Sequence, residues 1–258
     1  MQYEIVGHEM QALSLSLAAG EKVFGEAGAL LYMTDGIKMD TVMGTGKDAG
    51  LLGNLLTGVK RAVSGAGLFV TTFESFQASG KVVFSAPYPG KIIPLNLAET
   101  GDIICQRDAF LCSEMGTDIN IVFTKRLGAG FFGGEGFILQ RLSGKKTVFI
   151  HACGTLLPID LAANESIRVD PGCLVAMTDR VDYDVQLAPG IKTMLFGGEG
   201  FFQTVLRGPG RVFLQTLPLS RLANRLLGSS FARGSQVGAG SIVEQVGGGL
   251  MNGIFGNE

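Results

Sequence analysis

The residues that could do chemistry are few in this chain, and none of them completes a known catalytic or metal-binding set. His8 and His151 are the only histidines. His151 and Cys153 lie two residues apart, so both side chains would face the same side of a strand. Two ligands do not make a zinc site, and the four cysteines show no CxxC spacing. We therefore expect no catalytic residues, no metal site and no enzyme activity.

A glycine pattern at residues 128–133 has the form of a dinucleotide-binding fingerprint. Gly128, Gly130 and Gly133 have the GxGxxG spacing. Such a motif binds pyrophosphate only when a helix follows it. Here the phrase that follows is typical of a strand, so we interpret the glycines as a lead-in to that strand and expect no cofactor.

Two glutamates stand in identical surroundings. Glu135 and Glu199 each lie inside Gly-Gly-Glu-Gly, two residues before a phenylalanine, and Thr71 holds the corresponding place in an earlier copy of the phrase. Pseudo-threefold symmetry could bring these three candidate ligand positions near a common axis, where flanking glycines let backbones approach closely. The alternative is a solvated turn carboxylate that accepts a hydrogen bond from a neighbouring amide, which is common at turns.

These residues belong to a threefold internal repeat. Phe73, Phe137 and Phe201 are spaced 64 residues apart, and Gly80, Gly144 and Gly208 keep the same spacing. A second phrase begins at Leu15, Leu95 and Ile159, and residues 28–35 match residues 172–179. Such self-similarity indicates stacked units that bury their apolar faces against one another.

Each phrase is typical of a β-hairpin. Thr147 to Ile150 is a β-branched and aromatic run that leaves a glycine turn, and residues 166–170 alternate with period two. Short strands with turns at close spacing indicate a sandwich or barrel. We predict an all-β fold of three similar β-units in one body, like a double-stranded β-helix or β-sandwich. Phe84, Phe149 and Phe213 should be buried at like positions.

Two segments lie outside the repeats. An insertion at about 44–64 carries apolar residues every four positions, which predicts a short amphipathic helix. It could pack on the body or a partner subunit, or lie on a membrane surface. After the body at 1–218, residues 219–258 predict a short C-terminal helix, capped by Ser220, and a glycine-rich apolar tail.

Composition excludes several classes of function. The net charge is −2 and the pI near 5.8, so no basic footprint for nucleic acid exists. The first residues include early acids and no long apolar core, so we expect no signal peptide. No apolar run reaches the roughly 20 residues of a transmembrane helix. We expect a cytoplasmic protein, with a peripheral place on a membrane as an alternative.

Several motifs together resemble a known family. They are LLGNLLTGVKRAVSGAGLFVTTF, APYPGKIIPLNL, GGEGF, VDPGCLVAMTD and GPGRVFLQT. Over residues 1 to 218 the chain is similar to the altered-inheritance-of-mitochondria family. The resemblance implies three similar β-units with a fold like that of the tryptophan RNA-binding attenuation protein. It implies no agreed activity for bacterial and archaeal members, whereas eukaryotic relatives are tied to organisation of the mitochondrial inner membrane.

The leading hypothesis is a non-enzymatic oligomeric scaffold or interaction protein. Its first expected partner is another copy of the chain, because two apolar appendages need a covering surface. A membrane surface or another protein is a further candidate partner, and nucleic acid is not. The competing hypothesis is a small-ligand binding module that uses clefts between the β-units.

Overall fold

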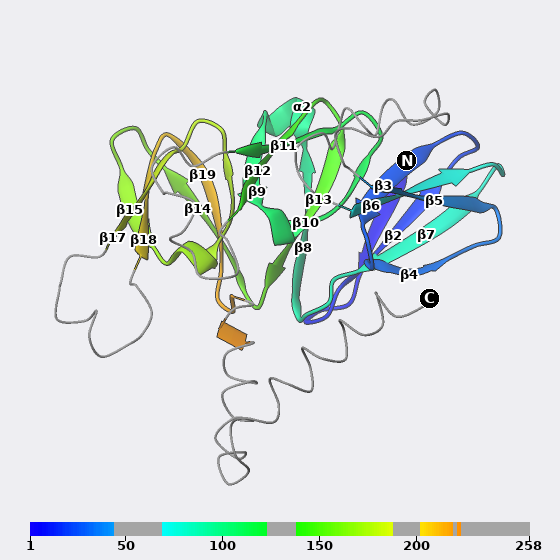
Figure 1. Cartoon of the computed structure of the whole chain (residues 1–258), viewed down its shortest axis with the longest axis horizontal. Helices are drawn as coiled ribbons and strands as arrows, with labels where there is room; N and C mark the ends of the chain where they lie inside the picture. The colour runs from blue at the N-terminus through cyan, green and yellow to red at the C-terminus, as the bar shows by residue number, and fades with distance from the viewer. Residues whose placement is uncertain (44–68, 123–137, 188–201, 219–220, 223–258) are drawn as a thin grey trace, which may run out of the picture. The chain divides into compact units, whose positions relative to one another are not determined.

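The computed structural model describes residues 1–43, 69–122, 138–187, 202–218 and 221–222 (Figure 1). Met1–Pro218 forms one compact unit, and the account below concerns this body. Most of its described residues lie in antiparallel strands, with only one-turn helices between them. The all-β prediction is therefore confirmed. The predicted helical insertion at 44–64 and nearly all of the tail lie outside the described residues. Residues 221–222, within the predicted C-terminal helix, are helical.

The strands fall into three sets of six, preceded by β1 (Gln2–Val6). Repeat 1 consists of β2 (Ala12–Leu17), β3 (Lys22–Glu26), β4 (Leu30–Met33), β5 (Ile37–Met43), β6 (Phe69–Ser75) and β7 (Gly80–Ser85). Repeat 2 consists of β8 (Gly90–Asn96), β9 (Ile103–Gln106), β10 (Phe110–Glu114), β11 (Asp118–Val122), β12 (Leu139–Ser143) and β13 (Thr147–Cys153). Repeat 3 consists of β14 (Leu156–Leu161), β15 (Ser166–Val169), β16 (Leu174–Thr178), β17 (Asp182–Leu187), β18 (Phe202–Arg207) and β19 (Gly210–Gln215). Helix α2 (Leu97–Thr100) and the turns η1 (Arg107–Ala109) and η2 (Pro171–Cys173) connect strands.

All three repeats share one pairing scheme. The first and third strands of a repeat pair with its sixth strand, and the second and fourth strands pair with its fifth. Each repeat therefore consists of two three-stranded halves. The prediction of three similar β-units agrees with this scheme.

Strand pairing between repeats joins the halves into larger sheets. The second strand of one repeat pairs with the third strand of the next, as β3 with β10 and β9 with β16. We call these two pairings the inner seams. They give a first sheet β1-β2-β7-β4, a second β5-β6-β3-β10-β13-β8, a third β11-β12-β9-β16-β19-β14 and a fourth β15-β18-β17. Consequently β4, the third strand of repeat 1, and β15, the second strand of repeat 3, form no seam with any described strand.

The hydrophobic core consists of three clusters, one between each pair of successive sheets. Leu13, Leu15 and Leu17 of the first sheet pack on the second sheet. The other face of the second sheet packs on the third, and the third packs on the fourth through Leu206. Burial patterns follow from this layering. The end-sheet strand β2 alternates leucine with serine, whereas β13, covered on both faces, is buried almost throughout.

The three predicted core phenylalanines are buried, but not all at like positions. Phe84, Phe149 and Phe213 are 0%, 0% and 7% exposed. Phe149 and Phe213 are equivalent, since they face Cys112 and Ala176 at the same point of the scheme. Phe84 instead faces Leu30, as Ile150 faces Phe110. Phe84 therefore lies one position further along its strand.

The strand register also corrects the alignment of repeat 1 with the other two repeats. The equivalents of Phe73, by their pairing with the second strand, are Leu142 and Leu206 rather than Phe137 and Phe201. Repeat 1 has a longer hairpin connection here, because β6 ends at Ser75 and β7 begins at Gly80, whereas β18 ends at Arg207 and β19 begins at Gly210. The equal spacing of phenylalanine and glycine in the sequence conceals this difference. The second phrase is aligned in all three repeats as the sequence indicates. Its first residues lie at equivalent positions, because they face equivalent valines of the sixth strands: Leu15 faces Val82, Leu95 faces Val148 and Ile159 faces Val212.

We predict that Phe149→Ala lowers the free energy of unfolding by about 3–5 kcal/mol, because it leaves a cavity in a closely packed layer. Phe149 is fully buried and its ring lies edge-on to Tyr3, with ring centroids 5.0 Å apart. Urea titration measures the effect. Phe76→Ala is the matched control, since Phe76 is 63% exposed and its loss should change stability little. Equal effects of the two substitutions would contradict the layered core.

Candidate functional site

The sequence singled out Thr71, Glu135 and Glu199, and only Thr71 lies within the described residues. Thr71 is buried on β6 and faces Gly25 of β3. Its equivalents by register are Gln140 and Thr204, both fully buried. A polar side chain therefore recurs at this position in all three repeats. The roles of Glu135 and Glu199 as ligand positions stay a prediction.

His151 and Cys153 lie on β13, with both side chains buried. Burial lowers the pKa of His151 to about 4, so its imidazole is neutral near pH 7. The Tyr88 ring packs on the imidazole with centroids 4.5 Å apart, and Nδ1 of His151 has no hydrogen-bond partner among the described residues. Within the described part of the chain, no group of three His, Cys, Asp or Glu side chains is placed to hold a metal ion.

The junction between repeats 2 and 3 is held by two glutamine amides. Gln106 Nε2, at the end of β9, donates to the carbonyl of Pro171 in η2 at 2.7 Å. Gln215 Nε2, at the end of β19, donates to the carbonyl of Gly172 at 2.8 Å. Both amides bind the turn that leads into the seam strand β16. They therefore fix the start of this strand beside β9.

At the junction between repeats 1 and 2 the same two positions carry titratable side chains. By register, Glu26 replaces Gln106 and His151 replaces Gln215. Burial, together with the nearby Asp108 carboxylate, raises the pKa of Glu26 to about 7. Here Tyr88 Oη donates to the carbonyl of Asp108 in η1 at 3.2 Å. Gln215 Nε2 makes the corresponding bond to the carbonyl of Gly172 in η2. A neutral Glu26 and a neutral His151 suit this junction, which indicates a structural role for both.

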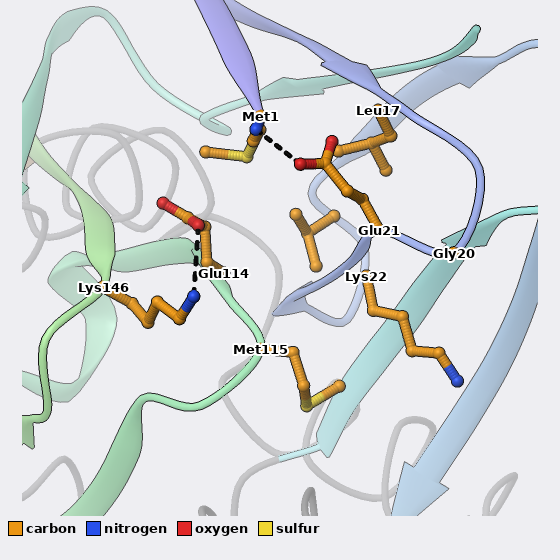
Figure 2. Close-up of a pocket in the computed structure, with 9 residues that line it drawn as sticks. Met1, Leu17, Gly20, Glu21, Lys22, Glu114, Met115 and Lys146 are labelled. Carbon is orange, nitrogen blue, oxygen red and sulfur yellow. Dashed lines mark hydrogen bonds and ion pairs between the residues drawn. The ribbon is translucent and has the colours of Figure 1, made fainter. Parts of the chain in front are cut away.

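A pocket of about 250 Å³ lies between repeats 1 and 2. Figure 2 shows its charged side chains, from Glu21 and Lys22 on one side to Glu114 and Lys146 on the other. Glu21 accepts a hydrogen bond from the amino group of Met1 at 2.6 Å, which lowers the pKa of Glu21. Glu114 Oε1 accepts the backbone N–H of Thr147 at 3.2 Å, and its other oxygen lies 4.0 Å from Lys146 Nζ. Both carboxylates thus have partners.

We call β4 and β15 the terminal edges, because they are the third and second strands of their repeats, the positions that form seams elsewhere, and pair with no described strand of another repeat. They lie toward opposite sides of the body in Figure 1. Leu31 and Tyr32 of β4 are 56% and 50% exposed, whereas their equivalents in β10, Leu111 and Cys112, are 1% and 0% exposed. The equivalents in β16, Val175 and Ala176, are buried to the same degree. The terminal edges therefore expose strands whose copies are core elsewhere in the same chain.

Sequence reasoning missed the terminal edges as a candidate interaction site. The signal was present in part, since residues 28–35 match residues 172–179 and β16 is a buried seam strand. What the sequence could not supply was the pairing of strands between repeats. Without that pairing, nothing distinguishes Leu31 and Tyr32 from ordinary core residues.

The family of the chain follows from comparison with known proteins. Residues 3–217 match the family described as Mitochondrial biogenesis AIM24. The chain belongs to this family. The match covers the whole of the three-repeat body, so the six-strand scheme and the inner seams are features of an AIM24 family member.

Similar proteins come from Streptococcus pyogenes. An uncharacterised protein of serotype M6 is 28% identical over 216 residues, covering 83% of this chain and 84% of that protein. A crystal structure of a protein from the same species is similar with a TM-score of 0.70 and 24% identity, covering 88% of this chain and 99% of that one. The structural likeness concerns the fold alone. The expected likeness to the tryptophan RNA-binding attenuation protein is not confirmed by these comparisons and stays a prediction.

We predict that Glu26→Gln stabilises the protein at pH 8 and has little effect at pH 4. The folded state holds the pKa of Glu26 near 7, above its unfolded value, so its contribution is present below about pH 4.5 and is lost as the pH rises through 7. The amide copies Gln106 and carries no charge. Because Glu26 is partly exposed, the gain should be on the order of 1–2 kcal/mol.

Urea titration at both pH values measures this difference. Glu4→Gln, which removes an exposed carboxylate on β1, is the control for a simple change of net charge. A gain from Glu26→Gln that is equal at pH 4 and pH 8 would contradict the raised pKa.

Proposed function

We propose that the chain is a non-enzymatic scaffold or interaction protein that assembles with further copies of itself. The observation that carries this proposal is the exposure of Leu31 and Tyr32 on β4. Fully burying side chains of this size contributes roughly 1.5–3 kcal/mol each. An exposed apolar edge strand also presents unpaired backbone groups to any other strand. A partner that covers β4 would remove both costs.

A second copy is the partner that best fits this edge. In this chain, strands equivalent to β4 are covered by strands equivalent to β15, at both inner seams. Within the described residues, β15 at one terminal edge and β4 at the other have no such partner. Each edge is thus the natural complement of the opposite edge in another copy. Such a head-to-tail contact gives a ring if the rotation closes and a filament if it does not.

The other parts of the proposal rest on separate observations. A role without catalysis is supported by the paired carboxylates of the pocket and by the glutamine counterparts of Glu26 and His151. No helix among the described residues is long and apolar enough to cross a membrane. A cytoplasmic place, and association with a membrane surface or another protein through residues 44–64, are proposed from composition and apolar spacing alone.

A small-ligand binding module is the second candidate function, favoured by the pocket between repeats 1 and 2. Its volume of about 250 Å³ lies just below the usual range for ligand sites, roughly 300–1,000 Å³. A thermal-shift screen of small zwitterions and anions tests it. A ligand whose shift is lost in Glu114→Gln and kept in Glu99→Gln would support this function. No shift from any class of ligand would count against it.

For the scaffold we predict that the wild-type chain is oligomeric at micromolar concentration and that Leu31→Glu weakens assembly at least tenfold. A carboxylate in a dry seam is costly to bury. Light scattering over a dilution series measures the mass. Phe76→Glu is the matched control, since Phe76 is equally exposed but lies outside the terminal edges. A wild-type chain that remains monomeric would remove the proposal.

A further inference from the structure

We propose that β15 of one copy pairs with β4 of the next in the register of the inner seams, and that Arg168 of β15 forms an ion pair with Asp35 of the next copy. This inference rests on the proposed self-assembly and adds to it a register and a specific charge pair. It follows from equivalences among residues on the two inner seams and the two terminal edges.

The inner seams share one register. At the seam of β3 with β10, Gly25 faces Cys112 and Phe24 faces Ser113. At the seam of β9 with β16, Cys105 faces Ala176 and Ile104 faces Met177. The residue that follows the third strand of each seam also makes the same backbone contact: Met115 N–H donates to Lys22 O at 3.1 Å, and Asp179 N–H donates to Asp102 O at 3.1 Å.

This register transfers to the terminal edges residue by residue. Tyr32 is equivalent to Cys112 and Ala176, because each follows the same bulge in its pairing with the sixth strand. Val169 is equivalent to Gly25 and Cys105, because each faces the recurring polar position on the fifth strand. Tyr32 should therefore face Val169 of the other copy. Met33 then faces Arg168, and Asp35 N–H donates to Ser166 O.

Arg168 occupies a place that is apolar in the other repeats. Its equivalents Phe24 and Ile104 are 0% and 4% exposed, whereas Arg168 is exposed in the single chain. A second copy that covers this position would enclose its charge. Burying an unpaired charge is costly, so the covering copy must supply a carboxylate.

Asp35 is placed to be that carboxylate. It lies in the turn that follows β4, two residues beyond Met33, and so close to the diagonal neighbour of Arg168, within the reach of a long side chain. The equivalent of Asp35 is Asp179, whose carboxylate lies 3.6 Å from Arg141 across the inner seam of repeats 2 and 3. Arg141 faces Ile104, the equivalent of Arg168. At the inner seam the arginine is therefore on β12, one strand away from the pairing, whereas at the terminal edge Arg168 is on the edge strand β15 itself. Neither Arg168 nor Asp35 has an ion-pair partner within the described residues.

A charge exchange tests the ion pair. We expect Arg168→Glu and Asp35→Lys each to weaken assembly at least tenfold, and the double variant to recover most of the wild-type association, as sedimentation velocity would measure. Arg180→Glu, an exposed charge change outside β15, is the control. Single variants that assemble as the wild type does, or a double variant no better than either single, would overturn the ion pair.

A disulfide tests the register. Directly opposite residues of an antiparallel pair have Cβ atoms about 4.5–5.5 Å apart, so Tyr32→Cys with Val169→Cys should cross-link successive copies under mild oxidation. Leu31→Cys with Val169→Cys is the control one residue out of register. Wild-type oligomers without cross-linking of the first pair would overturn the register and leave self-assembly standing. A monomeric wild-type chain would overturn both.

Discussion

The pairing of the second strand of one repeat with the third strand of the next is the interaction on which the rest of the body depends. Without it, each repeat is two separate three-stranded halves. With it, halves of neighbouring repeats become six-stranded sheets whose two faces are both covered. Phe24 and Cys112 illustrate the result, since they belong to adjoining seam strands yet pack into different clusters. One set of backbone hydrogen bonds thus organises two hydrophobic layers.

The two inner seams carry different polar side chains at the same two positions beside the turn that precedes the seam strand. Gln106 and Gln215 bind the η2 turn with neutral amides, which carry no charge at any pH. Glu26 and His151 occupy the same positions at the other seam, where burial disfavours their charged forms. The raised pKa of Glu26 and the lowered pKa of His151 are the consequence. The junction of repeats 1 and 2 is therefore the one we expect to respond to pH.

The sequence alone was enough to predict the repeats, the all-β class and the burial of Phe149 and Phe213, because each of these depends on local spacing and strand propensity. The alignment of repeat 1 with the other repeats was not predictable. Its hairpin before Gly80 is longer, yet the spacing from phenylalanine to glycine is the same in all three repeats. Nor could the terminal edges be predicted. Whether Leu31 is core or surface depends on which strand lies beside β4, and that is a long-range property of the topology.

The sheet edges of this chain differ in how far they discourage pairing with another strand. The edge strand β14 carries Pro158, which has no N–H to donate, and Asp160, which is paired with Arg211 at 2.6 Å. Proline and charge are the usual means by which edges avoid pairing with other chains. The strand β4 has only apolar residues, Leu30 to Met33. Its bulge is no protection, because the seam strands β10 and β16 have the same bulge and are paired. The open edge β4 of the first sheet and the protected edge β14 of the third sheet differ in the way expected if β4 is covered by a partner, as proposed above.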